Sequence, residues 1–437
     1  MSPLLVSSTR VRAMLRTLFA DGPEYLERKK RPFAPPKISL AEVHAAIPPH
    51  LRQRSTLKGL YYVSRDVFFG VLFYTLALYI DPAADYVSAT LGHGSTFSAS
   101  LKAAFWLSYW FWQGVLFTGF WCLAHEAGHD TMSPHKSVNQ IIGYSLHTFL
   151  LVPYYSWRST HRSHHKGTAS LERDENYLPR TRSDYNLPTL SRARLADYRE
   201  AFEDAPLYIL LRMLLMQAVG WHAYLLWNAL GNKKYPPGTN HFNPSSPLFK
   251  AHERQQIIAS NMGIAAMAGA LALYAHSHGL GAFIKLYFIP YLLANHWVVF
   301  LTFLQHSDPT IPHYRGQAWS FLRGSLATVD RPLLGWIGRF FMHNISHDHI
   351  AHHLFSRIPF YNQPEVTKQL IRVLKEHYNY DSTNTFRALY RSFTECCFIE
   401  DEGDIVFYKN QDGVPQRELK EEDEDVDSGF ESNASVD

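Results

Sequence analysis

The stretch AAFWLSYWFWQGVLFTGFWCLAHEAGH, residues 103–129, decides the fold, because a long apolar run ends directly in a pair of histidines. A membrane-spanning helix needs about 20 predominantly apolar residues, and residues 103–124 meet that length. His125 and His129 follow four positions apart, so a continuing helix places both imidazoles on one face. The sequence therefore predicts a membrane protein that presents histidines where a span leaves the bilayer.

Two further clusters share the pattern H-x-x-H-H and consist of His161, His164 and His165, and of His349, His352 and His353. Helical positions i, i+3 and i+4 lie on one face, so each cluster can direct its imidazoles at one point. Imidazole is a good ligand for iron, copper, nickel and zinc. Eight convergent imidazoles exceed what one four-coordinate ion can use, so we predict two metal ions held almost entirely by histidine.

A ninth histidine follows the last long apolar run. His306 in FLTFLQHSDP lies at the same membrane boundary as His129, and we predict that it is also a ligand. Ligand imidazoles usually hydrogen-bond a carboxylate or carbonyl through their second ring nitrogen. The residues close enough in sequence to support the ligands in this way are Glu126, Asp130, Asp174, His343 and Asp348.

The remaining apolar runs determine the expected topology. If the three clusters share one site, an even number of membrane crossings must separate them. The run 206–227 contains Arg212, which suits an interface better than a bilayer centre, and 141–157 contains Pro153. We therefore expect an all-α membrane protein with four transmembrane helices in two hairpins and a cytosolic helical cap that holds the dimetal site. The spans are predicted at about 66–82, 103–124, 256–275 and 283–304, with 141–157 and 206–227 interfacial.

Charge predicts the orientation and the domain limits. The segments 81–101 and 276–283 contain no Lys or Arg, so positive-inside bias places them in the lumen and the histidines and both termini in the cytosol. We expect a cytosolic N-terminal segment over 1–60, a membrane domain over 61–410 and an acidic, disordered tail over 411–437. The net charge of +3 argues against a nucleic-acid partner.

Two other classes of function fit part of the pattern. His125, Glu126 and His129 also match H-E-x-x-H, the signature of zinc proteases, but that function leaves both H-x-x-H-H clusters unexplained. A non-enzymatic membrane protein with a structural metal is the other alternative. Metal analysis separates the classes, because they predict about two irons, one zinc or no metal per chain.

The complete set of motifs resembles the membrane-bound fatty acyl desaturase family, most closely the delta-12 (oleate) desaturases of plants and fungi. The resemblance is carried by the three histidine clusters together with SLERDENYLP (170–179), TFLQHSDPTIPHY (302–314), LRGSLATVDR (322–331) and HNISHDHIAHHLFSRIPFYN (343–362). The first cluster in that branch often has the sequence H-E-C-G-H-H, whereas Ala127 and Asp130 replace the cysteine and the last histidine here.

The resemblance implies an enzyme of the endoplasmic reticulum membrane with a di-iron centre. Such an enzyme uses O₂ and electrons from cytochrome b5 and its reductase to convert an oleoyl phospholipid to a linoleoyl phospholipid. The H-P-G-G heme motif of a fused cytochrome b5 module is absent, so the electron donor is expected to be a separate protein. A fatty acid hydroxylase, an omega-3 desaturase or a conjugase shares the scaffold and stays an alternative.

Overall fold

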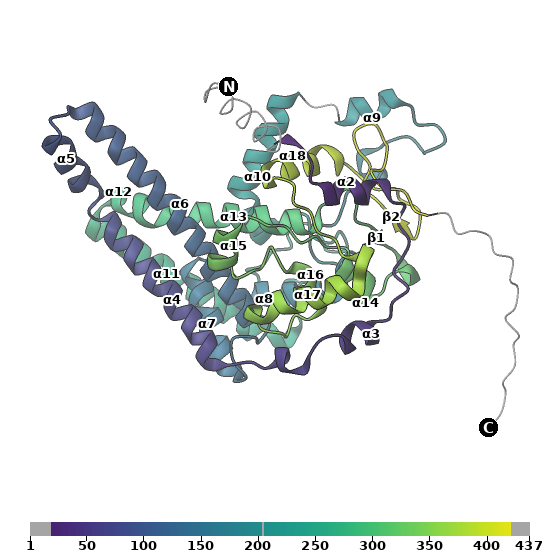
Figure 1. Ribbon diagram of the computed structural model, residues 1–437, viewed down its shortest axis with the longest axis horizontal. Coiled ribbons are helices and arrows are strands. Elements are labelled where there is room, and N and C mark those ends of the chain that lie inside the picture. Colours follow the sequence, from purple (N-terminus) through teal and green to yellow (C-terminus); the bar gives the residue numbers. More distant parts are fainter. Residues whose placement is uncertain (1–18, 203–204, 421–437) are drawn as a thin grey trace, which may run out of the picture.

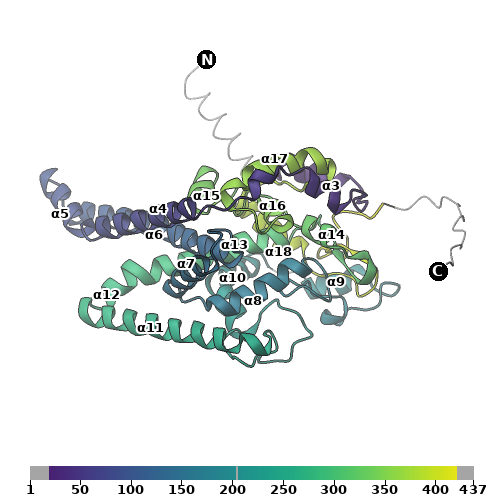
Figure 2. The same cartoon turned by 90° about the horizontal axis from the view of Figure 1, so that it is seen from below.

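The computed structural model describes residues 19–202 and 205–420, and the remaining residues, including 421–437 of the predicted acidic tail, lie outside this range. The described chain is mostly helical, with one short two-stranded sheet. Figures 1 and 2 show an arm of long helices that extends from a body in which shorter helices gather.

The arm and its continuation into the body are built from one set of elements that includes the longest helices. These are α4 (Thr56–Ala77), α5 (Ile80–Thr90), α6 (Ser95–Gly128), α7 (Lys136–Phe149), α8 (Tyr154–Gly167), α10 (Pro206–Trp227), α11 (Arg254–His278), α12 (Leu280–Phe283), the π-helical turn η4 (Ile284–Phe288) and α13 (Ile289–His306).

The body contains the shorter elements. They are α2 (Pro23–Lys30), α3 (Leu40–Ala45), α9 (Leu195–Phe202), α14 (Phe321–Leu326), α15 (Trp336–Phe341), α16 (His349–Leu354), α17 (Gln363–Leu374), α18 (Thr385–Glu395), the 3₁₀ turns η1 (Pro49–Arg52), η2 (Ser183–Tyr185), η3 (Ala251–Glu253), η5 (Gly316–Ala318), η6 (Phe360–Asn362) and η7 (Lys375–His377), and the strands β1 (His313–Tyr314) and β2 (Ile405–Val406). The two strands pair antiparallel, with His313 opposite Val406.

Helix α6 is the central element of the fold. Its C-terminal half is buried on every side, whereas much of its N-terminal half is exposed. It packs against α4, α5, α7 and α13. Leu116 and Phe300, both 0% exposed, belong to the large apolar core that α6 and α13 share. This core fixes the C-terminal ends of both helices, where His125, His129 and His306 lie.

Three described helical segments are long and apolar enough to cross a membrane: Pro206–Trp227, Ala251–His278 and Leu280–His306. Helices α4 and α5 pass the same test as a pair that is bent by 48°. The mostly helical, membrane-spanning character predicted from the sequence is therefore confirmed, with three candidate spans or up to four in the described chain.

The candidate spans differ in detail from those predicted. Helix α10 is one of the candidate spans, although 206–227 was expected at the interface. Helix α6 contains the predicted span 103–124 but is not among the candidate spans. The predicted span 66–82 crosses the break between α4 and α5. Pro82 explains this break, because in a continuous helix its ring would clash with the carbonyl of Leu78.

The segment 411–420, which the sequence assigns to the disordered tail, is paired with the N-terminal region. The Phe33 amide donates to the Glu418 carbonyl at 2.7 Å, and the Lys420 amide donates to the Phe33 carbonyl at 2.8 Å. The Arg417 side chain is buried and donates to the Arg31 carbonyl at 2.9 Å. These backbone pairs place the limit of the ordered body at least ten residues beyond the expected boundary at 410.

Candidate metal centre

The three histidine clusters meet in the body although they lie on separate helices. The first lies at the C-terminal end of α6, the second on α8 and the third on the six-residue helix α16. His306 is the last residue of α13. The helical spacing explains the convergence within each cluster, and the shared core of α6 and α13 brings the helix ends together.

The histidines form two groups in which the ligand atoms lie within 4.8 Å of one another. The larger group is His125, His129, His161, His165 and His352, and the smaller is His164, His306 and His353. The ninth, His349, places its Nε2 3.0 Å from Nε2 of His306 and so lies beside the smaller group. The structure thus brings together all nine histidines singled out in the sequence, and it divides them between two places.

The distances between ring nitrogens suit metal ligation. Nε2 of His161 lies 3.0 Å from Nε2 of His129 and 3.1 Å from Nε2 of His165. Two nitrogens bound about 2.0–2.1 Å from one ion at ordinary coordination angles are about 2.9–3.4 Å apart. In the smaller group, the separation between Nε2 atoms of His164 and His306 is 3.3 Å. Both groups therefore have the nitrogen spacing expected around an ion.

Burial keeps these imidazoles in the neutral form that binds metal. It lowers the pKa of His352 to about 3, and the neighbouring His125 contributes in the same direction. The pKa values of His161 and His165 are also lowered, first by burial and then by adjacent imidazoles. Neutral histidines with ring nitrogens directed at one another are a donor set that fits two metal ions.

Two of the five expected supporting residues contact the histidines. Asp174 Oδ1 lies 2.6 Å from His164 Nδ1. Glu126 Oε1 lies 3.2 Å from His125 Nδ1 and 3.6 Å from His352 Nδ1. Thr131 donates its hydroxyl to the other Glu126 oxygen at 2.7 Å, which fixes the orientation of the carboxylate. Such contacts select the ring nitrogen that remains available to a metal.

The other three expected supporting residues have different partners. Asp130 accepts from Arg162 at 2.7 Å. Asp348 lies 3.3 Å from Arg339. His343 places Nε2 2.7 Å from Oδ2 of Asp66, a residue of α4 that is 0% exposed. Proximity in sequence could not show that Asp130, Asp348 and His343 have other partners than the ligands. Those partners, two arginines and Asp66, are brought near only by the fold.

A cavity of about 420 Å³ reaches both histidine groups. Five of the nine histidines line it, namely His125, His161, His164, His306 and His349. Its other walls come mainly from α10 and α13 and include Val219, Val299 and Thr302. Tyr177 also lines the cavity, and its hydroxyl hydrogen-bonds Thr302 at 2.5 Å. The cavity therefore extends from α10 to both histidine groups.

Aromatic side chains that the sequence analysis did not select support the histidines. The ring of Trp157 stacks on His161 with a centroid distance of 4.5 Å, and Trp121 stacks on His125 at 5.6 Å. Each tryptophan precedes its histidine by four positions, so both pairs lie on one helical face. The i,i+4 spacing of Trp and His was therefore a signal available in the sequence. Tyr177, which stacks on His306 at 5.7 Å, had no such signal.

Comparison with known proteins agrees with this site. A family model described as fatty acid desaturase matches residues 104–384. The delta(12) fatty acid desaturase of Mortierella alpina is 40% identical over 385 residues, which cover 87% of this chain and 92% of the relative. The delta(12)-fatty-acid desaturase of Arabidopsis thaliana is 36% identical, covering 88% and 94%. The oleate hydroxylase of Claviceps purpurea is 36% identical, covering 87% and 82%.

The fold and the site define a helical membrane protein with a histidine-rich centre able to hold metal ions. The chain belongs to the fatty acid desaturase family. The resemblance stated from the three histidine clusters is therefore confirmed, and the protein is an oxidoreductase of that family.

Proposed function

We propose that the protein is a delta-12 fatty acid desaturase that converts an oleoyl chain of a membrane phospholipid to a linoleoyl chain. The observation that carries the proposal is the convergence of nine histidines at one place in the fold, where five of them line a largely apolar cavity. The 40% identity to the delta(12) desaturases of two Mortierella species supports the position of the new double bond.

The two histidine groups would hold two iron ions. The larger group offers five imidazoles, and the smaller offers three with His349 beside it. Bound iron and O₂ would supply the oxidising power needed to remove hydrogen from unactivated CH₂ groups, which no acid or base side chain can do. Asp174 hydrogen-bonds Nδ1 of His164 and so would direct Nε2 of that ring toward an ion, while the Glu126 carboxylate lies beside His125 and His352.

The acyl chain would enter the cavity along α10. Beyond the histidine cavity lies a second cavity of about 180 Å³, and Met216, Leu230 and Phe393 line both. An extended chain can therefore follow one path toward the histidines. The pair formed by Tyr177 and Thr302 lies on this path, where it would limit how the chain lies against the ions. Small shifts in such positions alter reactivity strongly.

Helix α6 supports a membrane placement with the histidines at one face. Near its start, Trp106 Nε1 donates to Asp81 at 2.9 Å, and Trp110 Nε1 donates to the Lys285 carbonyl at 2.9 Å. Tryptophan with charged residues is typical of a membrane interface. From Trp106 to His125 the helix rises about 28 Å at about 1.5 Å per residue, close to the thickness of the hydrocarbon core.

We propose that the histidine face is cytosolic and that the membrane is that of the endoplasmic reticulum. The absence of Lys and Arg from 81–101 supports this orientation. A relative from Brassica juncea, named omega-6 fatty acid desaturase of the endoplasmic reticulum, is 36% identical. The cytosolic face would receive electrons from cytochrome b5 and its reductase.

Expression in a yeast that makes oleate but no linoleate tests the function. Gas chromatography of total lipids should show a new diene with double bonds at carbons nine and twelve, and the purified protein should contain about two irons per chain. The matched control is His352→Ala, which removes one ligand. Conversion of supplied linoleate alone would contradict the delta-12 position, and a zinc-dependent peptidase activity would contradict the reaction class.

A hydroxylase is the second candidate, because the Claviceps purpurea oleate hydroxylase is 36% identical over most of both chains. The same lipid analysis distinguishes the two reactions. Hydroxylated oleate as the main product would establish the hydroxylase and leave the assignment of the histidines unchanged.

A further inference from the structure

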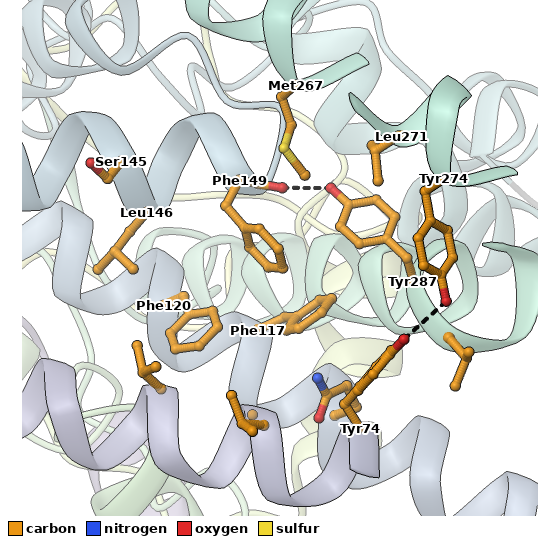
Figure 3. Close-up of a pocket in the computed structure, with 15 residues that line it drawn as sticks. Tyr74, Phe117, Phe120, Ser145, Leu146, Phe149, Met267, Leu271, Tyr274 and Tyr287 are labelled. Carbon is orange, nitrogen blue, oxygen red and sulfur yellow. Dashed lines mark hydrogen bonds between the residues drawn. The ribbon is translucent and has the colours of Figure 1, made fainter. Parts of the chain in front are cut away.

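Another large cavity, distinct from the two described above and of about 460 Å³, lies between the helices of the arm. Figure 3 shows its walls: Phe117 and Phe120 come from α6, Phe149 from α7, and Met267 and Leu271 from α11. Its volume falls in the range of about 300–1,000 Å³ that ligand-binding pockets occupy. The cavity is therefore large enough for an extended apolar ligand.

This cavity is separate from the one at the histidines. On α6 its lining residues are Gln113, Phe117 and Phe120, which follow one face of the helix at spacings of four and three. The histidine cavity contacts the adjoining face, through Trp121 and His125. No residue lines both cavities within the described chain, and α6 forms the wall between them.

The chemistry of the walls indicates what can occupy the cavity. Its lining contains no Lys, Arg, Asp or Glu, so a free carboxylate or phosphate would find no counter-charge inside. Val67 and Val71 of α4 line it and are 45% and 60% exposed, so the cavity reaches the outer surface of the arm. An uncharged hydrocarbon chain can enter there while its head group stays outside.

Two polar features mark the interior. Tyr74 of α4 and Tyr274 of α11 hydrogen-bond through their hydroxyls at 3.1 Å, which joins the two sides of the cavity (Figure 3). Gln113 is 4% exposed, and its Oε1 has no hydrogen-bond partner among the described residues.

The position along α6 identifies the membrane leaflet. In the placement proposed above, Gln113 lies about 10 Å from Trp106 along the helix, toward the bilayer centre, because each residue adds about 1.5 Å. The nearest interface is therefore the one marked by Trp106 and Lys285, opposite the histidines. Leu286, directly after Lys285, lines the cavity.

We propose that this cavity binds one acyl chain of a phospholipid from the leaflet opposite the histidine centre. The bound chain contacts both α4 and α11 and so connects the two sides of the arm. The proposal uses the membrane placement given above but not the reaction, and its test therefore needs no turnover.

Photo-crosslinking tests the site directly. The full chain, in nanodiscs that contain phosphatidylcholine with a diazirine on one acyl chain, is irradiated, and modified peptides are mapped by mass spectrometry. Phe117 and Phe120 are 3% and 6% exposed, so lipid at the outer surface cannot reach them. We expect labelling at these two residues. Leu271→Trp places a large ring in the cavity and should reduce the labelling by about tenfold, which corresponds to a weakening of lipid binding by about one order of magnitude.

The matched control is Leu273→Trp on the same helix, because Leu273 is 67% exposed and does not line the cavity. This variant should keep its labelling. If Leu271→Trp is poorly produced, Met267→Phe fills the same space. Absence of label at Phe117 and Phe120 in the wild type, or equal labelling in both tryptophan variants, would overturn the proposal. Labelling only by a diazirine fatty acid or a diazirine sterol would also overturn it.

His352→Ala separates this proposal from the proposed function. The variant should lose the reaction and retain labelling at Phe117. If the wild type is labelled at Phe117 but carries out no desaturation, the proposed function is contradicted and the lipid site is not.

Discussion

The histidine centre and a second buried polar cluster show two different ways of placing polar groups inside this protein. The second cluster, here called the arginine–aspartate cluster, consists of Arg28, Asp308, Arg331, Asp381 and Arg391. All five residues are at most 7% exposed. Arg331 pairs with Asp308 at 2.7 Å, and Arg391 pairs with Asp381 at 2.5 Å. Each aspartate is thus held by oppositely charged groups of the chain itself.

The histidine centre lacks this internal match. Its imidazole nitrogens face other imidazole nitrogens at 3.0–3.3 Å, as His161 faces His129 and His164 faces His306. Two lone pairs directed at each other repel unless a proton or a metal ion lies between them. The arginine–aspartate cluster is therefore matched in charge within the folded chain, whereas the histidine centre offers a set of neutral nitrogen donors that can hold metal ions. We therefore expect the first cluster to stabilise the fold and the second to carry out the proposed chemistry.

The largest expected effect is loss of activity without loss of the fold. We expect His352→Ala to lower linoleate formation by more than about 100-fold, since even the partners of metal ligands contribute about 10- to 100-fold. Bound iron should fall with it, while the protein remains in the membrane with an unchanged elution profile. The control is His93→Ala, which alters an exposed histidine distant from the site. Normal product from His352→Ala would contradict the assignment of this ligand.

The opposite behaviour is expected for the arginine–aspartate cluster. Asp381→Asn removes the carboxylate that the buried Arg331 and Arg391 share, and breaking a buried pair costs about 3–5 kcal/mol of stability. Thermal denaturation of the purified variant should show this loss, with iron per folded chain unchanged. The pair of Asp197 with the exposed Arg194, whose charged atoms lie 3.9 Å apart, provides the control, because Asp197→Asn should cost about 0–1 kcal/mol. Equal stability of the two variants would remove the distinction between the clusters.

Acid should affect the two clusters in different pH ranges. The pKa of His352 is about 3 in the fold and about 6.5 in an unfolded chain, so the unfolded state binds more protons between these values. Stability of the iron-free protein should therefore fall as the pH drops below about 6.5, by about 1.4 kcal/mol per unit for this histidine. Burial opposes ionisation of Asp381, but Arg331 and Arg391 hold its pKa below the usual value.

Because the pKa of Asp381 is lowered in the fold, the stability that its ionised form contributes is lost only when the pH falls below about 3.9. Melting temperatures measured from pH 7.5 to 5 therefore report on buried histidines and not on Asp381, and comparison of variants assigns the part that belongs to His352. The slope should decrease in His352→Ala and not in Asp197→Asn. An identical slope in both variants would contradict the burial of a neutral imidazole at this position.

The sequence predicted the part of the site that depends on local spacing. Within one helix, His161 and His165 lie four positions apart, so their common face follows from helical geometry. His306 could be selected because it ends an apolar run. The partners of Asp130 and His343 were not predictable in the same way. They depend on Arg162 and Asp66, and no local pattern indicates which distant residues will meet.

The fold shows the same limit. Apolar runs predicted helices and a membrane, because burial of backbone in hydrocarbon requires helical hydrogen bonds. The role of α10 was harder to predict, since one arginine in an otherwise apolar run is compatible with an interface and with a span. The arginine–aspartate cluster has no sequence signal, because Arg28 and Arg391 are more than 300 positions apart. The pairing of Phe33 with Glu418 was hidden for the same reason.

The contacts of α2 with segments far along the chain have a consequence for synthesis. The partners of α2 are made late: Arg28 donates to Thr310, 282 positions later, and the Tyr25 hydroxyl donates to Glu395, 370 positions later. At about 5–20 residues per second, a ribosome needs about 20–70 s to cover the longer interval. The first described helix of the protein must therefore wait, with its arginine still hydrated, until nearly the whole chain has left the ribosome.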